Sequence, residues 1–337
     1  MRLELFIAII LGVHWAQASQ VKPLGITCRD GVEEVPAQVV NADSYYSESP
    51  VVHEQSLYHV EYSQDRVMRV RDGRVDEFWK GTGCGPSAVT PYHGGFLVAC
   101  YSSHQLVFLS DHGELLRIWQ TPPAVSPAIT PNDFVADAWG GLYFTSSGIF
   151  NADPLTPVEG RVYYLGPDGA ITEVASGIHY SNGIALSSSG DTLWVSEHLE
   201  NRILKYTVLG PGVLDPSQSV FADLSVLFPW ERSGDDPMAS PYLGPDGFRV
   251  SQGIVFVAQY AGSRILKLNE AGQRVGVITF KSSFPNTTNV WADGNRLYVT
   301  AVRDDSELGV KSVNPAIVVR IDDPRLRERS DLVCEIK

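Results

Sequence analysis

Apolar and polar positions along this chain repeat in a fixed three-part order. A turn that carries a polar residue runs into a short apolar strand. A second strand of the type Leu-aromatic-Val follows, and a third strand alternates apolar and polar residues. The second strands are Leu57-Tyr58-His59-Val60, Leu97-Val98-Ala99, Leu142-Tyr143-Phe144, Leu193-Trp194-Val195, Val255-Phe256-Val257 and Leu297-Tyr298-Val299.

The turns that open the repeats occur in six versions. They are Ser47-Glu48-Ser49-Pro50, Cys84-Gly85-Pro86-Ser87, Pro131-Asn132-Asp133-Phe134, Ser181-Asn182-Gly183-Ile184, Pro245-Asp246-Gly247-Phe248 and Thr288-Asn289-Val290-Trp291. Six such units in the same order predict radial repetition, because one unit cannot bury both of its faces alone. We therefore expect an all-β fold, a six-bladed β-propeller with an axial site.

The repeat spans almost all of the 337-residue chain. This predicts one propeller domain over residues 19–337 rather than two domains. Residues 19–44 carry little periodicity. We expect them either to lead into the first blade or to supply a strand that closes the last one.

The largest irregular stretch, residues 209–245, is rich in Pro, Gly, Asp and Ser. It predicts a long loop with one helical turn near Phe221 to Leu227. Because it ends on Asp246, its aromatic residues are candidates for a lid or pocket wall over the axis. The alternative is that they pack back on a blade. These residues are Phe228, Trp230 and Tyr242.

Residues 1–18 have the features of a signal peptide: Arg2, an apolar run from Leu5 to Val13, and the small-residue site Ala16-Gln17-Ala18. The alternative, an uncleaved anchor, is disfavoured because the run is well short of the roughly 20 residues that a bilayer span needs. No other stretch is long and apolar enough to span. We expect export to the periplasm or the extracellular space, with no membrane partner.

Four cysteines in an exported protein suit two disulfides, for which three pairings are possible. We favour Cys28 with Cys334, because closing a propeller brings the chain ends together. Cys84 and Cys100 would then pair across one blade. Asn286-Thr287-Thr288 is a glycosylation sequon in a host that glycosylates.

The formal net charge of -13 argues against a nucleic-acid partner, which requires a surface rich in Lys and Arg. The same charge is compatible with a cation site. A solvated acidic surface explains it equally well.

In a propeller the first strand of each blade lines the central channel, so residues at one repeat position form a ring. This brings four polar residues to one point: Glu48, Asn132, Asn182 and Asp246. Two carboxylates and two amide carbonyls are hard oxygen ligands and fit Ca²⁺. Mg²⁺ and Mn²⁺ use the same ligand type. The lack of a repeated His or Cys disfavours a thiolate or multi-histidine zinc site.

Ordinary turn chemistry is the alternative explanation for these residues. Asn, Asp and Gly before a strand are good turn formers, and for Asn182-Gly183 alone this explanation suffices. Four polar residues in phase, one of them the poor turn former Glu48, favour the metal site.

Other polar residues lie near the expected channel mouth. Asp133 and Asp137 flank the Asn132 segment and could support the site or hold a separate cation. For Asp133 we favour a turn cap. His198 comes just after the Leu193 strand, and His104 lies in the matching stretch of the second blade. We interpret each as a polar surface histidine or one with its hydrogen bonds satisfied, rather than as a base.

Four segments also carry a family resemblance. They are Glu48-Ser49-Pro50-Val51, Asn132-Asp133 with Asp137 and Gly140-Gly141-Leu142-Tyr143, Ser181-Asn182-Gly183-Ile184-Ala185 and Pro245-Asp246-Gly247. In this order they resemble the signature segments of the senescence-marker-protein/gluconolactonase/luciferin-regenerating-enzyme family. Two departures bear on the shape of the ligand shell: Ser49, where the family usually has Gly, and Val52, where an aromatic residue is common.

The resemblance implies a six-bladed propeller with an axial divalent cation, commonly Ca²⁺ or Zn²⁺, and lactone hydrolysis as a frequent activity. By that similarity Glu48, Asn182 and Asp246 match the metal ligands. Asn132 matches a position that is a ligand in the related diisopropyl-fluorophosphatase and a substrate contact in gluconolactonases. The resemblance is less specific for substrate than for fold.

We therefore expect a secreted lactonase that acts on a small-molecule lactone with one divalent cation, Ca²⁺ before Zn²⁺, Mg²⁺ or Mn²⁺. The cation polarises the carbonyl while water attacks, and Asp246 positions or deprotonates that water, with Asn132 beside it. Three other classes stay open: a phosphotriesterase using the same residues, a metal-free condensing enzyme similar to strictosidine synthase, and a non-catalytic ligand-binding propeller.

Overall fold

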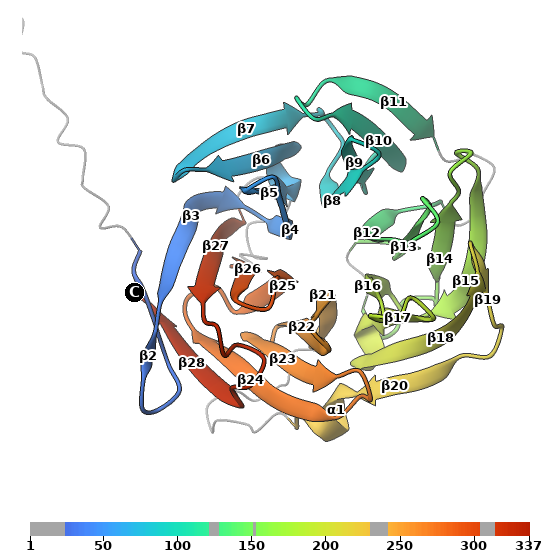
Figure 1. Cartoon of the computed structure of the whole chain (residues 1–337). Coiled ribbons are helices and arrows are strands. Elements are labelled where there is room, and N and C mark those ends of the chain that lie inside the picture. Colours follow the sequence, from blue (N-terminus) through green and yellow to red (C-terminus); the bar gives the residue numbers. More distant parts are fainter. Residues whose placement is uncertain (1–23, 121–127, 151–152, 230–241, 304–313) are drawn as a thin grey trace, which may run out of the picture.

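The computed structural model describes residues 24–120, 128–150, 153–229, 242–303 and 314–337. Their strands form six sheets that stand as blades around a central axis (Figure 1). The strand that opens each repeat lies nearest the axis, and the following strands pair antiparallel outward. The structure confirms the predicted all-β propeller. The predicted signal peptide lies outside the described residues.

The first three blades follow the chain in simple order. Blade 1 contains β4 (Ser47–His53), β5 (Ser56–Glu61), β6 (Arg66–Arg71) and β7 (Arg74–Lys80), with the 3₁₀ turn η1 (Tyr62–Gln64) after β5. Blade 2 contains β8 (Pro86–Tyr92), β9 (Gly95–Cys100), β10 (Gln105–Ser110) and β11 (Leu115–Gln120). Blade 3 contains β12 (Pro131–Ala136), β13 (Leu142–Ser146), β14 (Gly160–Leu165) and β15 (Ile171–Ile178).

The last three blades carry additions at their outer edges. Blade 4 contains β16 (Ser181–Leu186), β17 (Thr192–Glu197), β18 (Arg202–Gly210) and β20 (Ser219–Asp223), with η2 (His198–Glu200) and the short β19 (Val213–Leu214). Blade 5 contains β21 (Gly244–Ser251), β22 (Ile254–Tyr260), β23 (Arg264–Asn269) and β24 (Arg274–Lys281). Blade 6 contains β25 (Asn286–Ala292), β26 (Arg296–Val302), β27 (Pro315–Asp322) and β3 (Ala37–Tyr45).

Strand β3 closes the ring. It comes from the N-terminal part of the chain but pairs antiparallel with β27, placing Val39 opposite Val319. Of the two expectations for residues 19–44, the closing strand is therefore confirmed. A second seam lies outside blade 5, where β28 (Asp331–Ile336) runs parallel to β24 and pairs with β1 (Ile26–Arg29), which in turn pairs with β2 (Glu34–Val35).

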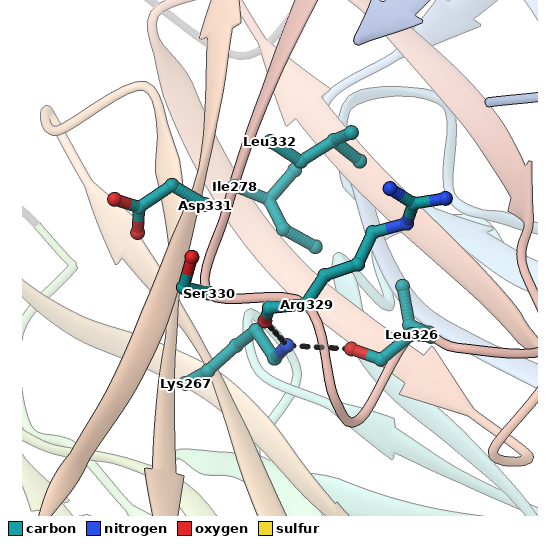
Figure 2. A pocket seen from close by; sticks show the side chains of 7 residues that line it. All are labelled: Lys267, Ile278, Leu326, Arg329, Ser330, Asp331 and Leu332. Atoms are coloured by element: carbon teal, nitrogen blue, oxygen red, sulfur yellow. Dashed lines mark hydrogen bonds between the residues drawn. The ribbon is translucent and has the colours of Figure 1, made fainter. Parts of the chain in front are cut away.

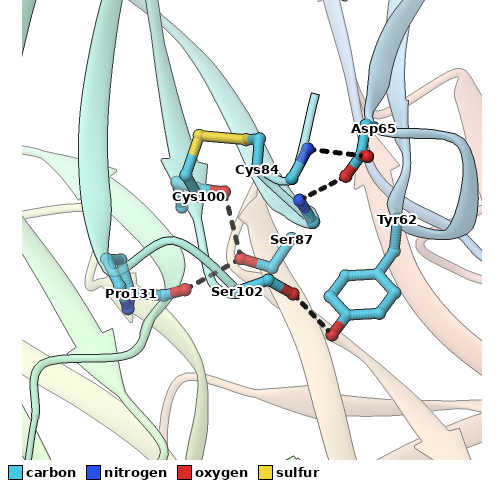
Figure 3. Close-up of a disulfide and its surroundings, with 10 residues drawn as sticks. Tyr62, Asp65, Cys84, Ser87, Cys100, Ser102 and Pro131 are labelled. Carbon is cyan, nitrogen blue, oxygen red and sulfur yellow. Dashed lines mark hydrogen bonds between the residues drawn. A yellow bond between two sulfur atoms is a disulfide. The ribbon is translucent and has the colours of Figure 1, made fainter. Parts of the chain in front are cut away.

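Both favoured disulfides are present. Cys28 and Cys334 lie opposite each other on β1 and β28, so this bond ties the two chain ends together. Cys84 and Cys100 join the entry of β8 to the end of β9 within blade 2 (Figure 3). The Asp65 carboxylate accepts hydrogen bonds of 2.8 Å from the backbone N–H groups of Gly83 and Gly85, on both sides of Cys84 (Figure 3).

The hydrophobic core is divided among the interfaces between neighbouring blades. Blades 1 and 2 share one cluster through Val60 and Val98, and blades 3 and 4 share another through Tyr143 and Val195. A cluster of the same kind lies between each remaining pair of neighbours. Burial between units is why six repeats fold where one cannot.

The long excursion after blade 4 packs on the propeller in its described part. Helix α1 (Leu224–Leu227) is the expected helical turn, and its N-cap Asp223 accepts hydrogen bonds from the N–H groups of Ser225 and Val226. Phe228 is only 2% exposed and lies in the core between blades 4 and 5. The lid role for Phe228 is therefore wrong. Tyr242 is exposed, and Trp230 lies outside the described residues.

A buried lysine fastens the C-terminal segment to blade 5. Lys267 on β23 is 1% exposed, and its amine donates hydrogen bonds to the carbonyls of Leu326 and Arg329 (Figure 2). Arg329 in turn pairs with Asp30, Glu33 and Asp323. Burial lowers the pKa of Lys267 to about 8. In the described part of the chain no helix has the length and apolarity to cross a membrane.

Candidate metal centre

Every inner strand breaks its pairing register at the same place. The irregularities lie between Glu48 and Val51, Pro86 and Ala88, Pro131 and Phe134, Ser181 and Ile184, Pro245 and Phe248, and Thr287 and Asn289. The polar residues of the repeat thus belong to bulges inside the strands, where sequence analysis expected a turn before each strand. Bulges re-aim side chains, and here they do so once per blade.

Three of the four proposed ligands lie inside these bulges. They are Asn132 on β12, Asn182 on β16 and Asp246 on β21, while Glu48 on β4 is the last paired residue before its own bulge. Asn182 and Asp246 are 7% and 4% exposed, and Glu48 and Asn132 keep a larger accessible fraction. All four therefore lie at or beside the register break of an inner strand, in blades 1, 3, 4 and 5.

The glycines that follow two of these ligands are explained by close approach between blades. A Cβ on Gly183 would lie 2.2 Å from the Asp246 carbonyl oxygen, and one on Gly247 would lie 2.1 Å from the Asn289 side chain. Neither glycine has a positive φ. Asn182-Gly183 is therefore a contact point between inner strands and not a hairpin turn.

Hydroxyl groups tie the ring together. Thr145 Oγ1 donates to the Asn182 carbonyl at 2.6 Å, and Ser196 Oγ donates to the Asp246 carbonyl at 2.9 Å. Thr288 Oγ1 makes the matching bond to the Ser47 carbonyl at 2.7 Å. Each donor belongs to the preceding blade, so the backbone beside each of these ligands is fixed by its neighbour.

The two carboxylates each receive an amide hydrogen bond. Hydrogen bonding from the Asn182 side chain lowers the pKa of Asp246, and hydrogen bonding from the Asn289 side chain lowers that of Glu48, both against the larger effect of burial. Asn132 Nδ2 donates to Ser147 Oγ at 2.9 Å, so its carbonyl oxygen is the end of the amide suited to a cation.

Asn289 is a site residue that sequence analysis missed. It is 2% exposed, and its Oδ1 accepts a 2.8 Å hydrogen bond from the N–H of Val290. That bond orients the NH₂ group toward Glu48. The sequence did contain a signal for it, because Asn289 stands in the sixth version of the repeated segment. Candidate ligands were taken only from the first, third, fourth and fifth versions.

Burial is the main cause of the raised pKa values of the two site carboxylates, Glu48 and Asp246. It raises the pKa of the Glu48 carboxyl well above its usual range, and the charges of Asp246 and Asp133 raise it further. Burial and the Asp133 charge likewise raise the pKa of Asp246. Among the ion pairs of the described residues, none joins Glu48 or Asp246 to a cationic side chain. Within the described part of the chain, these two acidic groups thus lie in the site without an ion-pair partner of their own.

Asp133 does not serve mainly as the turn cap that we favoured. It is 1% exposed and forms a two-pronged ion pair with Arg249, with both N–O distances 3.2 Å. The turn after β12 is capped by Asp137, which accepts hydrogen bonds from the N–H groups of Trp139 and Gly141.

The histidines near the mouth are structural, as expected. His198 is buried, its Nδ1 lies 3.1 Å from the Pro245 carbonyl, and burial lowers its pKa to about 4. It therefore supports the strand that carries Asp246. His104 is exposed, and its ring contacts the Ile129 carbonyl at 3.1 Å.

Aromatic side chains gather where the second strands end, beside the carboxylates. We call this set the aromatic collar: Tyr46, Tyr62, Tyr101, Phe150, Tyr180 and Tyr260. Tyr62 stacks on Phe150 with ring centroids 4.8 Å apart, and Tyr46 contacts both rings. After burial, the charges of Tyr260, Glu48 and Asp246 are the largest causes that raise the pKa of Tyr46, so this part of the collar lies close to the two carboxylates.

No cluster of three or more His, Cys, Asp or Glu side chains with metal-site geometry occurs within the described ranges. A site built here would therefore rely on two carboxylates supplemented by amide carbonyls. That donor set is all oxygen and carries two negative charges, which fits a hard divalent cation.

Residues 46–303 match the family model described as the SMP-30/Gluconolactonase/LRE-like region. The chain belongs to this family. Membership confirms the resemblance seen in the four motif segments.

Relatives in this family include lactonases. The chain is 29% identical over 212 residues to lactonase drp35 of Staphylococcus haemolyticus, covering 61% of this chain and 59% of that protein. It is 29% identical over 200 residues to lactonase drp35 of Staphylococcus aureus strain USA300, covering 57% and 56%. The match therefore spans less than two thirds of the length of these relatives.

Solved structures share the fold. A luciferin-regenerating enzyme aligns with a TM-score of 0.68 at 21% identity, over 86% of this chain and 95% of that one. The calcium-binding protein regucalcin of Agrobacterium tumefaciens gives 0.66 at 16% identity, over 86% and 95%. A gluconolactonase of Xanthomonas campestris gives 0.66 at 21% identity, over 90% and 95%.

Proposed function

We propose that this protein is a metal-dependent lactonase that opens a cyclic ester at the axial site. The observation that carries the proposal is the pair of carboxylates formed by buried Asp246 and partly buried Glu48, which has no cationic partner among the ion pairs of the described residues. Family membership and relatives named lactonase support the reaction class. The activity, the metal and the site residues are all parts of this proposal.

Glu48, Asn132, Asn182 and Asp246 would hold one divalent cation. A charge of two on the ion offsets the two carboxylates whose ionisation burial opposes. We propose Ca²⁺, which accepts several oxygen ligands in irregular geometry, and the calcium-binding neighbour regucalcin supports that choice. Zn²⁺, Mg²⁺ and Mn²⁺ are alternatives that the experiment below separates.

When bound, such a cation supplies Lewis-acid polarisation of the lactone carbonyl. Asp246 positions the attacking water and accepts its proton, while the hydrogen bond from Asn182 holds the carboxylate in one orientation. The water oxygen bonds to the carbonyl carbon, the ring C–O bond breaks, and the leaving oxygen takes a proton. The product is the open hydroxy acid. Asn132 contacts the substrate from blade 3.

The aromatic collar gives the mouth an apolar character. Phe150 is 37% exposed and packs edge-on against Tyr101 with ring centroids 5.7 Å apart. Rings of this kind contact the carbon skeleton of a ligand, and tyrosine hydroxyls add hydrogen bonds. We also propose export after removal of residues 1–18, for which the two disulfides are the structural support.

Elemental analysis of chelator-free protein comprising residues 19–337, followed by a lactone panel with and without EDTA, tests the proposal. The panel contains a sugar lactone, alkyl lactones, an aryl lactone and, for comparison, a phosphotriester. We expect about one Ca²⁺ per chain and ring opening that stops with EDTA and returns with Ca²⁺. No bound metal would overturn the ligand ring and favour a condensing or binding propeller. Turnover of the phosphotriester alone would identify a phosphotriesterase.

A further inference from the structure

One buried ion pair crosses the channel between blades that are not neighbours. Asp133 lies on β12 of blade 3 and Arg249 lies on β21 of blade 5, with blade 4 between them in the ring (Figure 1). Two N–O contacts of 3.2 Å join the guanidinium to the carboxylate. The side chains are 19% and 1% exposed.

Arg249 is fixed in this position. Its Nη1 also donates to the Phe248 carbonyl at 3.0 Å, and Phe248 is fully buried. Asp133 Oδ1 accepts a second hydrogen bond, from the N–H of Phe134 at 2.8 Å. Both partners are therefore held from two directions, and the two-pronged geometry is one that lysine cannot reproduce.

The pair is part of the electrostatics of the axial site. Asp133 follows Asn132 in the chain, and its charge acts on both Glu48 and Asp246. Without a partner, Asp133 would make the channel a site of three carboxylates. With Arg249 present, the sum over these four side chains is two negative charges, which equals the charge of one divalent ion.

We propose that the Arg249 guanidinium is a built-in counter-cation that neutralises Asp133 and so restricts the axial site to one divalent ion. This role rests on the metal site put forward under the proposed function. It makes Arg249 a positioning residue, since it acts through Asp133 and touches neither Glu48 nor Asp246 in the described hydrogen bonds.

Stability alone is a poor explanation for such a pair. Removing two charges from water costs about as much as their attraction returns, so a buried ion pair is weak evidence for stabilisation. An apolar pair could join blades 3 and 5 equally well. The ion pair lies beside the proposed ligands, where its charges affect cation binding.

Calorimetric titration of Ca²⁺ into metal-stripped protein tests the proposal with four variants. Arg249→Gln leaves Asp133 unpaired, so we expect a second bound ion or at least tenfold tighter binding of the first. Asp133→Asn leaves an unpaired guanidinium, so we expect affinity at least tenfold weaker. The double variant Asp133→Asn/Arg249→Gln restores neutrality with side chains of similar size, so we expect one ion bound within about threefold of the wild-type affinity.

Arg249→Lys keeps the charge and is the matched control. We expect it to bind one ion with an affinity near that of the wild type. If Arg249→Gln fails to fold in EDTA, as judged by circular dichroism, Asp133→Asn decides the case. If Arg249→Gln and Asp133→Asn each bind one ion within twofold of the wild-type affinity, the pair is only a tie between blades and the proposal is wrong. If the wild-type protein binds no divalent cation, the metal site fails together with the role of Arg249.

Discussion

Two groups of buried charge in this propeller are built in opposite ways. In the Lys267 group every charged side chain has a partner within the protein, because the amine donates to two backbone carbonyls and Arg329 forms ion pairs with three carboxylates. In the axial group only Asp133 has a cationic partner, and Glu48 and Asp246 are left to amide donors. Matched charge fastens a segment to the fold. Unmatched buried charge marks a place where a ligand completes the structure.

The largest expected effect comes from removing one unmatched charge. Asp246→Asn should lower lactone turnover by about 10³-fold or more, because proton transfer and cation binding are lost together. In metal-free protein the same change should raise the melting temperature, because burial and the Asp133 charge oppose ionisation of Asp246. Steady-state kinetics and thermal unfolding in EDTA measure the two effects.

The matched control is Asp168→Asn, since Asp168 lies on an exposed turn and accepts a hydrogen bond only from the N–H of Ala170. We expect wild-type turnover from it. Near-normal lactonase rates in Asp246→Asn would remove Asp246 from the mechanism.

Disrupting the Lys267 group should lower the stability of the fold and leave cation binding at the axial site unchanged. Lys267→Met leaves the carbonyls of Leu326 and Arg329 without their hydrogen-bond donor, so we expect the free energy of unfolding to fall by about 3 kcal/mol. Urea unfolding measures this, and calcium titration should show unchanged affinity. Lys205→Met, at an exposed position of β18, should shift stability by less than about 0.5 kcal/mol. Equal effects of the two changes would show that the Lys267 contacts contribute nothing.

His59 represents a third kind of buried ionisable side chain, one that the fold keeps neutral. His59 receives a hydrogen bond from Asn41 Nδ2 to its Nε2, and burial lowers its pKa from 6.5 to about 4. Its contribution to stability is complete above pH 6.5 and is lost as the pH falls toward 4, because the unfolded chain binds the proton more readily. We expect a loss of about 2 kcal/mol from this group by pH 5.

His59→Gln should therefore reduce the difference in urea-unfolding free energy between pH 7.5 and pH 5. His198, which shifts in the same direction, should retain its share of the difference. His112→Gln, at an exposed turn, is the control and should behave like the wild type. An unchanged pH dependence in His59→Gln would show that His59 is not the titrating group.

The order of the repeats predicted the propeller, offered the closing strand as one of two alternatives for residues 19–44, and favoured the two disulfides that the structure contains. Periodic apolar strands leave few ways to bury their faces, and a closed ring brings the ends together. The sequence also predicted that Glu48, Asn132, Asn182 and Asp246 lie on the first strands of their blades, as the structure shows. Their assignment as ligands stays a prediction until a metal is measured.

What the sequence could not predict depends on contacts between blades. Asp133 looked like a turn cap because its partner Arg249 is more than a hundred residues away, on a strand two blades further round the ring. Asn289 stood in the repeat, but its bond to Glu48 depends on closure of blade 6 against blade 1. For Phe228 the long loop left two alternatives open, a lid and packing back on a blade, and the side chain lies in the core between blades 4 and 5. Each error concerned the direction in which a side chain points.

The smallest expected effect is at the glycosylation sequon, where burial predicts no modification. Asn286 is 7% exposed on β25, and Thr287 and Thr288 are fully buried. A chain glycosylated at Asn286 could not form this inner strand, so we expect the protein secreted from a glycosylating host to keep its mass after glycosidase treatment. Ala170→Asn creates a sequon with Ile171 and Thr172 on an exposed turn and should acquire a glycan in the same host. A glycan on Asn286 with an intact fold would mean that β25 does not line the channel as described.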